Sequence, residues 1–387
     1  MRVLVVHNAY QQKGGEDSVM QAEVAMLSEQ GHSVELFLRH NDAINQMHRA
    51  TAALQTLWSG PAAREFEALL RSFNPDVVHV HNTFPLISPS IYWVAHRLGV
   101  PVVQTLHNFR ILCPQAMFLR EGKVCEDCLG KLPWRGAVRG CYRDSRLQST
   151  VLASMDTLHR GIGTWRNKVT RYIALNEFCR SKFIVGGLPA ERIVVKPNFV
   201  DFEAPPKAAR TGFLFVGRLS AEKGIDVLAG AATLLPNPQL RIAGDGPNAD
   251  LLDGVTGVHR LGRLPSAEVL NEMNGALAVV VPSIWYETFG MVVVEAFACG
   301  TPVIASRIGV LPCLVKEGET GLLFEPGNPR DLADKMTWAL THPQKMDEMG
   351  RNARALYEAE FTAERNHQQL MAIYQDAIND VKNKARK

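Results

Sequence analysis

Two carboxylates, Glu287 and Glu295, lie eight positions apart in a segment that is otherwise apolar and glycine-bounded. The pattern predicts a helix that begins near Phe289, so that Glu287 precedes it and Glu295 lies about two turns into it. An ionised carboxylate among apolar neighbours is costly to bury without a partner. The two hydroxyls of a ribose would satisfy such a carboxylate, because both can donate to its oxygens. The alternative is a capping role for Glu287 and a structural role for Glu295.

Cationic and glycine residues follow the apolar runs upstream of this pair. Gly217, Arg218 and Lys223 come after the run at 213–216, and Gly244 ends the run at 239–243. A strand that leads through a tight turn into a helix directs backbone N–H groups at whatever lies above it. Arg218 and Lys223 could neutralise a diphosphate there, or they are two solvated bases on a surface turn. Neither glycine group has the spacing G-x-G-x-x-G, which argues against a dinucleotide-dependent oxidoreductase.

Four cysteines fall in one aperiodic stretch, 108–146, with the spacing C-x11-C-x2-C-x12-C; they are Cys113, Cys125, Cys128 and Cys141. This pattern predicts either a closed four-cysteine zinc site or four reduced thiols packed in a loop, with an iron–sulfur cluster a poorer third choice. Zinc would explain how so long an aperiodic stretch stays folded. The total of seven cysteines is odd, which argues against a disulfide framework.

The composition excludes several classes of protein. The chain has 387 residues, 46% of them hydrophobic, which suggests two or three globular domains. Its net charge of +3 is too small to imply a nucleic-acid partner. The apolar run at 2–6 is too short for a signal peptide, and no run approaches the roughly 18 residues of a membrane span. We therefore expect a cytoplasmic protein. Residues 131–182 contain eleven Lys or Arg against three acids, which predicts a positive patch facing an anionic partner.

Strand-like and helix-like segments alternate along the chain, a pattern typical of parallel sheets with connecting helices. The expected strands are 2–6, 34–38, 76–80, 102–106, 172–175, 213–216, 239–243, 258–261, 278–281 and 302–305. A polar segment with two prolines at 201–211 predicts a linker. We expect an α/β fold with Rossmann-like domains at 1–200 and 201–360, the first carrying the cysteine-rich insertion, and an amphipathic C-terminal helix at 361–387.

In combination these segments resemble the retaining glycosyltransferases of family 4, which have the GT-B fold. The resemblance rests on the Glu-x7-Glu spacing of Glu287 and Glu295 between Pro-Ser and Cys-Gly-Thr-Pro, together with the glycine turns described above. Gly14-Gly15, Thr105-Leu-His107-Asn108 and Leu261-Gly-Arg263-Leu also occur in the order that the family shows. It covers most of the chain. It implies two Rossmann-like domains that face each other across a cleft and a last helix that crosses back onto the first domain.

The resemblance also implies a role for each matching residue. Arg218 and Lys223 would hold the diphosphate of a UDP- or GDP-sugar and stabilise its charge as it leaves. Glu295 would bind the ribose, Glu287 would position the donor sugar, and His107 would lie near the reacting carbon. The other donor-binding positions that it implies are Gly14, Gly15, Gly217, Gly244, Arg263, Phe289 and Gly290.

The function that follows is transfer of a sugar, with retention, from a nucleotide diphosphate sugar to a hydroxyl of a glycan or lipid-linked acceptor. Surface polysaccharide or lipid-linked glycan synthesis would use such an enzyme. Since no Asp-x-Asp pair occurs in the chain, we expect cationic side chains, and no catalytic metal, to hold the diphosphate. The alternatives are a nucleotide-sugar epimerase or phosphorylase of the same fold, and a nucleotide-sugar-binding protein without catalysis.

Four arginines in the basic stretch 131–182 have the spacing of a helix face. Arg135, Arg139, Arg143 and Arg146 recur at spacings of three and four, which places them on one face of a helix. Such a face could meet a lipid-linked diphosphate or the inner face of the membrane, or it is simply solvated.

Overall fold

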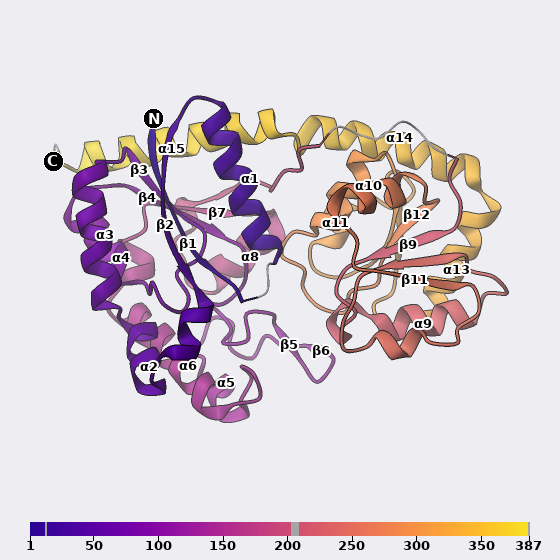
Figure 1. Cartoon of the computed structure of the whole chain (residues 1–387), viewed down its shortest axis with the longest axis horizontal. Helices are drawn as coiled ribbons and strands as arrows, with labels where there is room; N and C mark the ends of the chain where they lie inside the picture. The colour runs from indigo at the N-terminus through magenta and orange to yellow at the C-terminus, as the bar shows by residue number, and fades with distance from the viewer. Residues whose placement is uncertain (12–13, 203–208, 386–387) are drawn as a thin grey trace. The chain divides into compact units, whose positions relative to one another are not determined.

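The computed structural model describes residues 1–11, 14–202 and 209–385, and the chain forms two compact units (Figure 1). Unit 1 consists of Met1–Met117, Glu126–Asn198 and Asn366–Lys387, and unit 2 of Phe118–Cys125 and Phe199–Arg365. The central part of the expected linker, 203–208, lies outside the described residues. Within the described chain, no helix is both long and apolar enough to cross a membrane.

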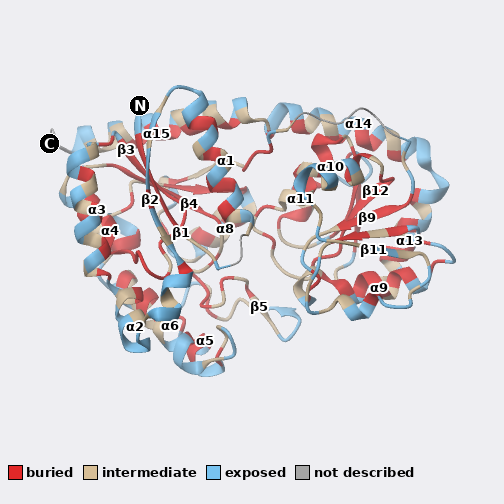
Figure 2. Ribbon diagram, in the orientation of Figure 1, coloured by how far each residue is buried: buried red, intermediate tan, exposed pale blue. Residues whose placement is uncertain are grey.

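Unit 1 is built on a six-stranded parallel sheet in the order β2-β1-β3-β4-β7-β8. Its strands are β1 (Arg2–Ala9), β2 (Ser33–His40), β3 (Val77–Val80), β4 (Val102–Leu106), β7 (Arg171–Ala174) and β8 (Ile193–Val195). Strands β3 and β4 are buried along their whole length, as their unbroken apolar sequences predict for a sheet covered on both faces (Figure 2). The chain passes from β1 to β2 on one side of β1 and then from β2 to β3 on its other side, so the carboxyl ends of β1 and β3 flank the switch point where sheets of this kind bind ligands.

The helices of unit 1 connect these strands. They are α1 (Gly15–Glu29), α2 (Arg49–Leu57), α3 (Gly60–Phe73), α4 (Ser90–Arg97), α5 (Trp134–Arg139), α6 (Arg146–Gly161), α7 (Thr164–Asn167) and α8 (Glu177–Val185), with short 3₁₀ turns η1 (Asn41–Gln46) and η2 (Ala190–Arg192). The expected C-terminal helix is α15 (Ala363–Ala385). From Asn366 onward it belongs to unit 1, where Leu370 and Tyr374 are fully buried.

The stretch 108–146 is more ordered than its sequence suggests. A two-stranded antiparallel ribbon, β5 (Leu119–Arg120) and β6 (Lys123–Val124), precedes helix α5. The expected single basic helix face is wrong. Helix α5 ends at Arg139 because Gly140 takes the left-handed conformation, with φ 70°, and α6 begins separately at Arg146. Arg143 lies in the turn between the two helices.

Unit 2 carries a second six-stranded parallel sheet, in the order β11-β10-β9-β12-β13-β14, which is the Rossmann order. Its strands are β9 (Phe213–Val216), β10 (Leu240–Ala243), β11 (Val258–Gly262), β12 (Ala278–Val281), β13 (Val303–Ser306) and β14 (Gly321–Phe324). Its helices are α9 (Ile225–Thr233), α10 (Ser266–Asn274), α11 (Met291–Ala298), α12 (Leu311–Leu314), α13 (Pro329–Thr341) and α14 (Pro343–Glu360), with 3₁₀ turns η3 (Ala221–Lys223) and η4 (Ala249–Leu252). The switch point lies between β9 and β12.

Candidate active site

Two glycine turns stand side by side at the carboxyl ends of β9 and β10 in unit 2. Gly217 follows β9 with φ 149° and Gly244 follows β10 with φ 153°, both in the region that favours glycine. A Cβ on Gly244 would lie 1.8 Å from the carbonyl oxygen of Gly217. The two turns therefore pack backbone against backbone, a contact that no side chain at residue 244 would allow.

Glu287, after β12, is a buried carboxylate with three donors. Its Oε1 lies 2.6 Å from Nζ of Lys223, and it accepts hydrogen bonds from Oγ of Ser283 at 2.8 Å and Nε1 of Trp285 at 3.1 Å. Burial by itself would raise the pKa of Glu287, but the Lys223 ammonium and these hydrogen bonds bring it below its ordinary value. The pair therefore fixes a lysine ammonium, in contact with an ionised carboxylate, near the carboxyl end of the sheet.

Glu295 has the opposite environment. It lies on the second turn of α11, whose N-cap is Gly290 with φ 81°. Within the described chain, no hydrogen bond or ion pair reaches its carboxylate, and burial raises the pKa of Glu295 to about 7. A ligand that donates two hydrogen bonds would satisfy this carboxylate and favour its ionised form.

The remaining positions predicted for the donor site lie around this edge of unit 2. Arg218 is exposed and directly follows Gly217. Arg263 is also exposed and follows Gly262, the residue whose carbonyl accepts a hydrogen bond from the Gly244 N–H at 2.7 Å. Phe289 is buried against Phe361, with ring centroids 6.1 Å apart, so its side chain supports the turn and only its backbone can meet a ligand.

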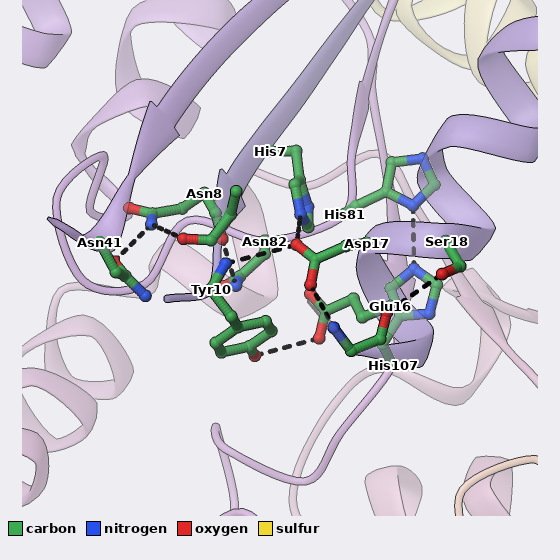
Figure 3. Close-up of polar contacts among 12 residues, drawn as sticks. His7, Asn8, Tyr10, Glu16, Asp17, Ser18, Asn41, His81, Asn82 and His107 are labelled. Atoms are coloured by element: carbon green, nitrogen blue, oxygen red, sulfur yellow. Dashed lines mark hydrogen bonds and ion pairs between the residues drawn. The ribbon is translucent and has the colours of Figure 1, made fainter. Parts of the chain in front are cut away.

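In unit 1 the carboxyl ends of the strands border a partly open pocket whose empty space, including solvent at its mouth, is about 530 Å³. Its lining includes His81, His107, Asn108 and Arg110. His107 follows β4, and its Nε2 lies 2.9 Å from Nδ1 of His81 (Figure 3). Burial lowers the pKa of both imidazoles well below the usual 6.5, so both are neutral at pH 7. The Arg110 guanidinium lies over the ring of Phe84, 4.4 Å from its centroid, and supplies positive charge to the pocket.

The Gly14-Gly15 segment is fixed to the same edge of unit 1. The Gly14 N–H donates to Asp17 Oδ2 at 2.8 Å, and Asp17 Oδ1 lies 2.8 Å from Nε2 of His7. The neighbouring Glu16 accepts from the Asn108 amide at 3.2 Å. Burial raises the pKa of Glu16 to about 8, so it is protonated at pH 7. Figure 3 shows the contact of Asp17 with His7 and that of Glu16 with the Tyr10 hydroxyl.

The buried residues of this region that the sequence did not predict include Glu23, His79, His81 and Lys196. The one available signal was the pair His79 and His81, two positions apart at the end of an apolar strand, which places both side chains on one face. Their ring centroids are 4.4 Å apart. Glu23 and Lys196 come from distant parts of the chain and have no such signal.

The structure leaves the cysteine prediction open. Cys113 and Cys128 are buried, whereas Cys125 and Cys141 are partly exposed. Cys125 belongs to unit 2 and the other three belong to unit 1. The four-cysteine zinc site therefore stays a prediction.

Known protein families match both units. The model of the group 1 glycosyl transferases matches residues 200–356, and that of a glycosyl transferase 4-like domain matches residues 14–198. D-inositol 3-phosphate glycosyltransferase from Thermobifida fusca is 36% identical over 333 residues, which cover 79% of this chain and 70% of that protein. Glycogen synthase from Mycobacterium tuberculosis is 30% identical over 308 residues, covering 75% and 66%.

Solved structures show the same architecture. Anabaena HepE in complex with UDP superposes with a TM-score of 0.69 at 20% identity, covering 96% of this chain and 99% of that one. Sucrose-phosphate synthase from Thermosynechococcus elongatus gives a TM-score of 0.70 at 19% identity, covering 98% and 99%. Both comparisons support the fold. Together with the family models and the 36%-identical relative, they show that this chain is an enzyme of the GT4-type glycosyltransferases, with the GT-B fold.

Proposed function

We propose that the enzyme transfers a sugar from a nucleotide diphosphate sugar to a hydroxyl acceptor with retention of the anomeric configuration. The observation that carries the proposal is the contrast between two carboxylates of unit 2, Glu287, which is buried, and Glu295, which is partly buried. Glu287 is paired with Lys223, whereas Glu295 has no partner among the described residues, and desolvation raises its pKa to about 7, so that it is about half protonated at pH 7. Solved complexes of HepE with UDP and with UDP-glucose support a nucleotide-sugar donor.

Each side chain then has a task at the donor. Glu295 accepts hydrogen bonds from the ribose hydroxyls, and Glu287 positions the sugar while holding Lys223 in place. Arg218 and Lys223 neutralise the charge that grows on the diphosphate as it leaves, so no catalytic metal is needed. The backbone N–H groups at Phe289 and Gly290 meet sugar or phosphate oxygens, and Arg263 contributes to the base pocket. Gly14 and Gly15 would let the backbone approach the donor closely.

The chemical step that we propose uses no protein nucleophile. The bond from the anomeric carbon to the diphosphate breaks, and its electron pair goes to the diphosphate oxygen. The acceptor oxygen bonds to the same face of that carbon, and its proton passes to the departing diphosphate. NMR of the product anomer tests this directly, because an inverted product contradicts it. Turnover that is lost with EDTA and restored by Mg²⁺ or Mn²⁺ would contradict the metal-independent step.

The acceptor belongs, in this proposal, in the unit 1 pocket lined by His107 and Arg110. Outside the pocket, unit 1 exposes Leu132, Trp134 and Val138 beside exposed Arg135. A tryptophan and aliphatic side chains among bases suit the interface of an anionic bilayer. We therefore propose a glycan or lipid-linked acceptor and a cytoplasmic enzyme that binds the inner face of the membrane peripherally. Some bases of 131–182 are already paired within the unit, as Lys182 is with Glu126.

Sedimentation with vesicles tests this membrane contact. We expect more protein to pellet with anionic than with neutral vesicles, and Val138→Asp to reduce that fraction, because Val138 is 70% exposed within the apolar group. Leu234→Asp, at a 52% exposed leucine of unit 2, is the matched control and leaves it unchanged. Equal recovery in both supernatants contradicts the contact.

Calorimetric titration with UDP, GDP and ADP tests the donor site. We expect one nucleotide to bind, and Glu295→Ala to weaken it at least about tenfold, or about 1.4 kcal/mol. Glu268→Ala removes an exposed carboxylate of the same unit and serves as the control. If none of the three nucleotides binds at millimolar concentration, the donor assignment fails. Product analysis without an acceptor then separates transfer from epimerase or phosphorylase chemistry, and binding without turnover would indicate a catalytically silent protein.

A further inference from the structure

A chain of buried polar contacts in unit 1 leads from His107 away from the pocket. Nε2 of His107 lies 2.9 Å from Nδ1 of His81, and Nε2 of His81 lies 3.4 Å from Oε2 of Glu23. The other oxygen of Glu23 lies 3.1 Å from Nζ of Lys196. His81, Glu23 and Lys196 are each at most 3% exposed. These three side chains are therefore almost entirely shielded from bulk solvent.

The protonation pattern of this chain follows from what each end can do. Lys196 can only donate, and an ionised Glu23 can only accept. The ring nitrogen Nε2 of His81 lies 3.4 Å from that carboxylate and makes no hydrogen bond among the described residues, so an N–H there would face the negative charge. A neutral His81 therefore places its proton on Nε2, and its Nδ1 becomes an acceptor. The only proton that can lie between His81 and His107 is then the one on Nε2 of His107.

We propose that Glu23 and His81 are positioning residues that hold His107 in the tautomer with its proton on Nε2 and its lone pair on Nδ1. This inference rests on the proposed function, in which His107 meets a hydroxyl of the donor sugar or of the acceptor. A lone pair on Nδ1 accepts a hydrogen bond from that hydroxyl, whereas the other tautomer would present an N–H to it. The second imidazole and the carboxylate thus set the direction of the hydrogen bond at the site.

The same cluster has the ligand spacing of a metal site, because atoms of Glu23, His79 and His81 all lie within 4.8 Å of one another. Its surroundings favour the chain of polar contacts described above over a bound metal ion. The Lys196 ammonium already provides a cation at Glu23, and a metal ion would have to displace or repel it. Both nitrogens of His79 are engaged, Nε2 with Thr105 at 2.8 Å and Nδ1 with the Tyr374 hydroxyl at 2.7 Å.

Helix α15 contributes two further contacts to this group of buried residues. Lys196 Nζ donates to the Asn366 side chain at 2.8 Å, and Tyr374 of the same helix reaches His79. These contacts hold Lys196 against Glu23 and pack His79 beside His81. Tyr374 contacts His79, which is not part of the chain of contacts from Lys196 to His107, whereas Glu23 is part of that chain.

The substitution Glu23→Gln gives the sharpest test, because Lys196 dictates how the amide lies. Lys196 can bind only the amide oxygen, which turns the NH₂ group toward Nε2 of His81. His81 must then accept at Nε2 and carry its proton on Nδ1, so His107 Nε2 becomes the acceptor and its proton moves to Nδ1. We expect the tautomers of both histidines to invert.

The tautomers are read from the ring ¹⁵N shifts of the full-length protein with labelled histidine, with the His107 signals assigned by their loss in His107→Gln. We expect the Nε2–H form of His107 in the wild type and the Nδ1–H form in Glu23→Gln. Tyr374→Phe is the matched control, buried in the same cluster, and should keep the wild-type tautomer. A wild-type His107 protonated on Nδ1, or an unchanged His107 in Glu23→Gln, overturns the proposal; the wild-type spectrum alone decides the first point if the variant does not fold.

Steady-state kinetics distinguish a positioning role of Glu23 from a general loss of structure in the variant. We expect Glu23→Gln to lower kcat at least tenfold while nucleotide affinity, which unit 2 provides, changes less than twofold. In a His107→Ala background the same substitution should change kcat less than twofold, since the group that it positions is gone. An equal loss in both backgrounds contradicts the positioning role. If the wild type transfers no sugar at all, the proposed function fails while the ¹⁵N spectrum still tests the positioning role.

Discussion

The raised pKa of Glu295 makes donor binding depend on pH in a direction that can be worked out in advance. Ribose hydroxyls donate to the ionised carboxylate, so binding selects the form that burial disfavours. With a pKa of about 7 in the free protein, the ionised fraction is roughly a tenth at pH 6 and nine tenths at pH 8. If the pKa in the complex falls below 6, affinity rises about tenfold over this range, or about 1.4 kcal/mol.

The sign of the effect on stability follows from the same shift. A carboxyl group whose pKa is higher in the folded than in the unfolded chain favours the fold most at low pH, where it is protonated in both states. That contribution is lost as the pH rises from the ordinary value of 4.5 through about 7, where the folded protein must ionise an unpartnered carboxylate. Above pH 7 the ionised Glu295 therefore destabilises the free protein, and a bound nucleotide would offset this destabilisation.

The assay is calorimetry with an intact nucleotide sugar at pH 6, 7 and 8. An intact nucleotide sugar is needed because free UDP carries a terminal phosphate that itself titrates near pH 6. The pKa of Glu287 lies below its ordinary value, so this second carboxylate does not titrate in the range. Titrations at pH 7 in two buffers of different ionisation enthalpy should show release of about half a proton per nucleotide bound.

Glu295→Gln is the control, since an amide still accepts a hydrogen bond but does not titrate. We expect its affinity for the nucleotide sugar to be weaker than that of the wild type and flat between pH 6 and 8. Two results would refute the reasoning: equal wild-type affinity at pH 6 and pH 8, or the same pH slope in Glu295→Gln. The first would mean that Glu295 does not meet the ribose, and the second that another group carries the titration.

Three further predictions test unit 2 and the cysteine-rich stretch. Gly244→Ala should destabilise unit 2 by about 3 kcal/mol or more, because the new Cβ meets the Gly217 carbonyl. Gly254→Ala, at a residue with φ 73° and open space around it, should cost about 1 kcal/mol, and thermal unfolding compares the two variants. Lys223→Met should cost about 3 kcal/mol by leaving Glu287 buried without its cation, and should lower nucleotide affinity; unchanged denaturant midpoints would contradict this. Protein purified without a chelator should contain about one zinc ion per chain if the four cysteines form a closed site. A zinc content below about 0.2 per chain would reject the site, and replacement of the four cysteines by serine should abolish zinc binding.

The sequence predicts the strands of this fold well because most are short apolar runs that end in glycine, proline or a polar residue. The expected strands at 102–106, 213–216 and 278–281 coincide with β4, β9 and β12. The order of strands within each sheet does not follow from such runs, because it depends on which side each connecting helix packs. The basic helix failed for a local reason: a spacing of three and four reports a helix only if nothing ends it, and Gly140 does.

The residues of the candidate site were likewise predictable from the sequence only in part. Glu287 could be singled out from the sequence, and two of its three donors, Ser283 and Trp285, lie within four residues of it. The chain of contacts around His107 could not, because Glu23, His81 and Lys196 come from three separate segments that only the folded sheet brings together. A buried acid in a helix and a buried base after a strand look like ordinary surface residues until their partners are known.

A lysine beside the carboxylate distinguishes Glu23 and Glu287 from Glu295. In unit 1, Glu23 is at most 3% exposed and lies against Lys196, as Glu287 lies against Lys223 in unit 2. A carboxylate with a lysine beside it can stay ionised when the site is empty. Glu295 has no such neighbour in the described chain, and the fold keeps it there at a cost in stability. A residue held in that state without a ligand is most simply explained by a ligand that supplies the missing donors, which is why the pH dependence of donor binding is the decisive property of this site.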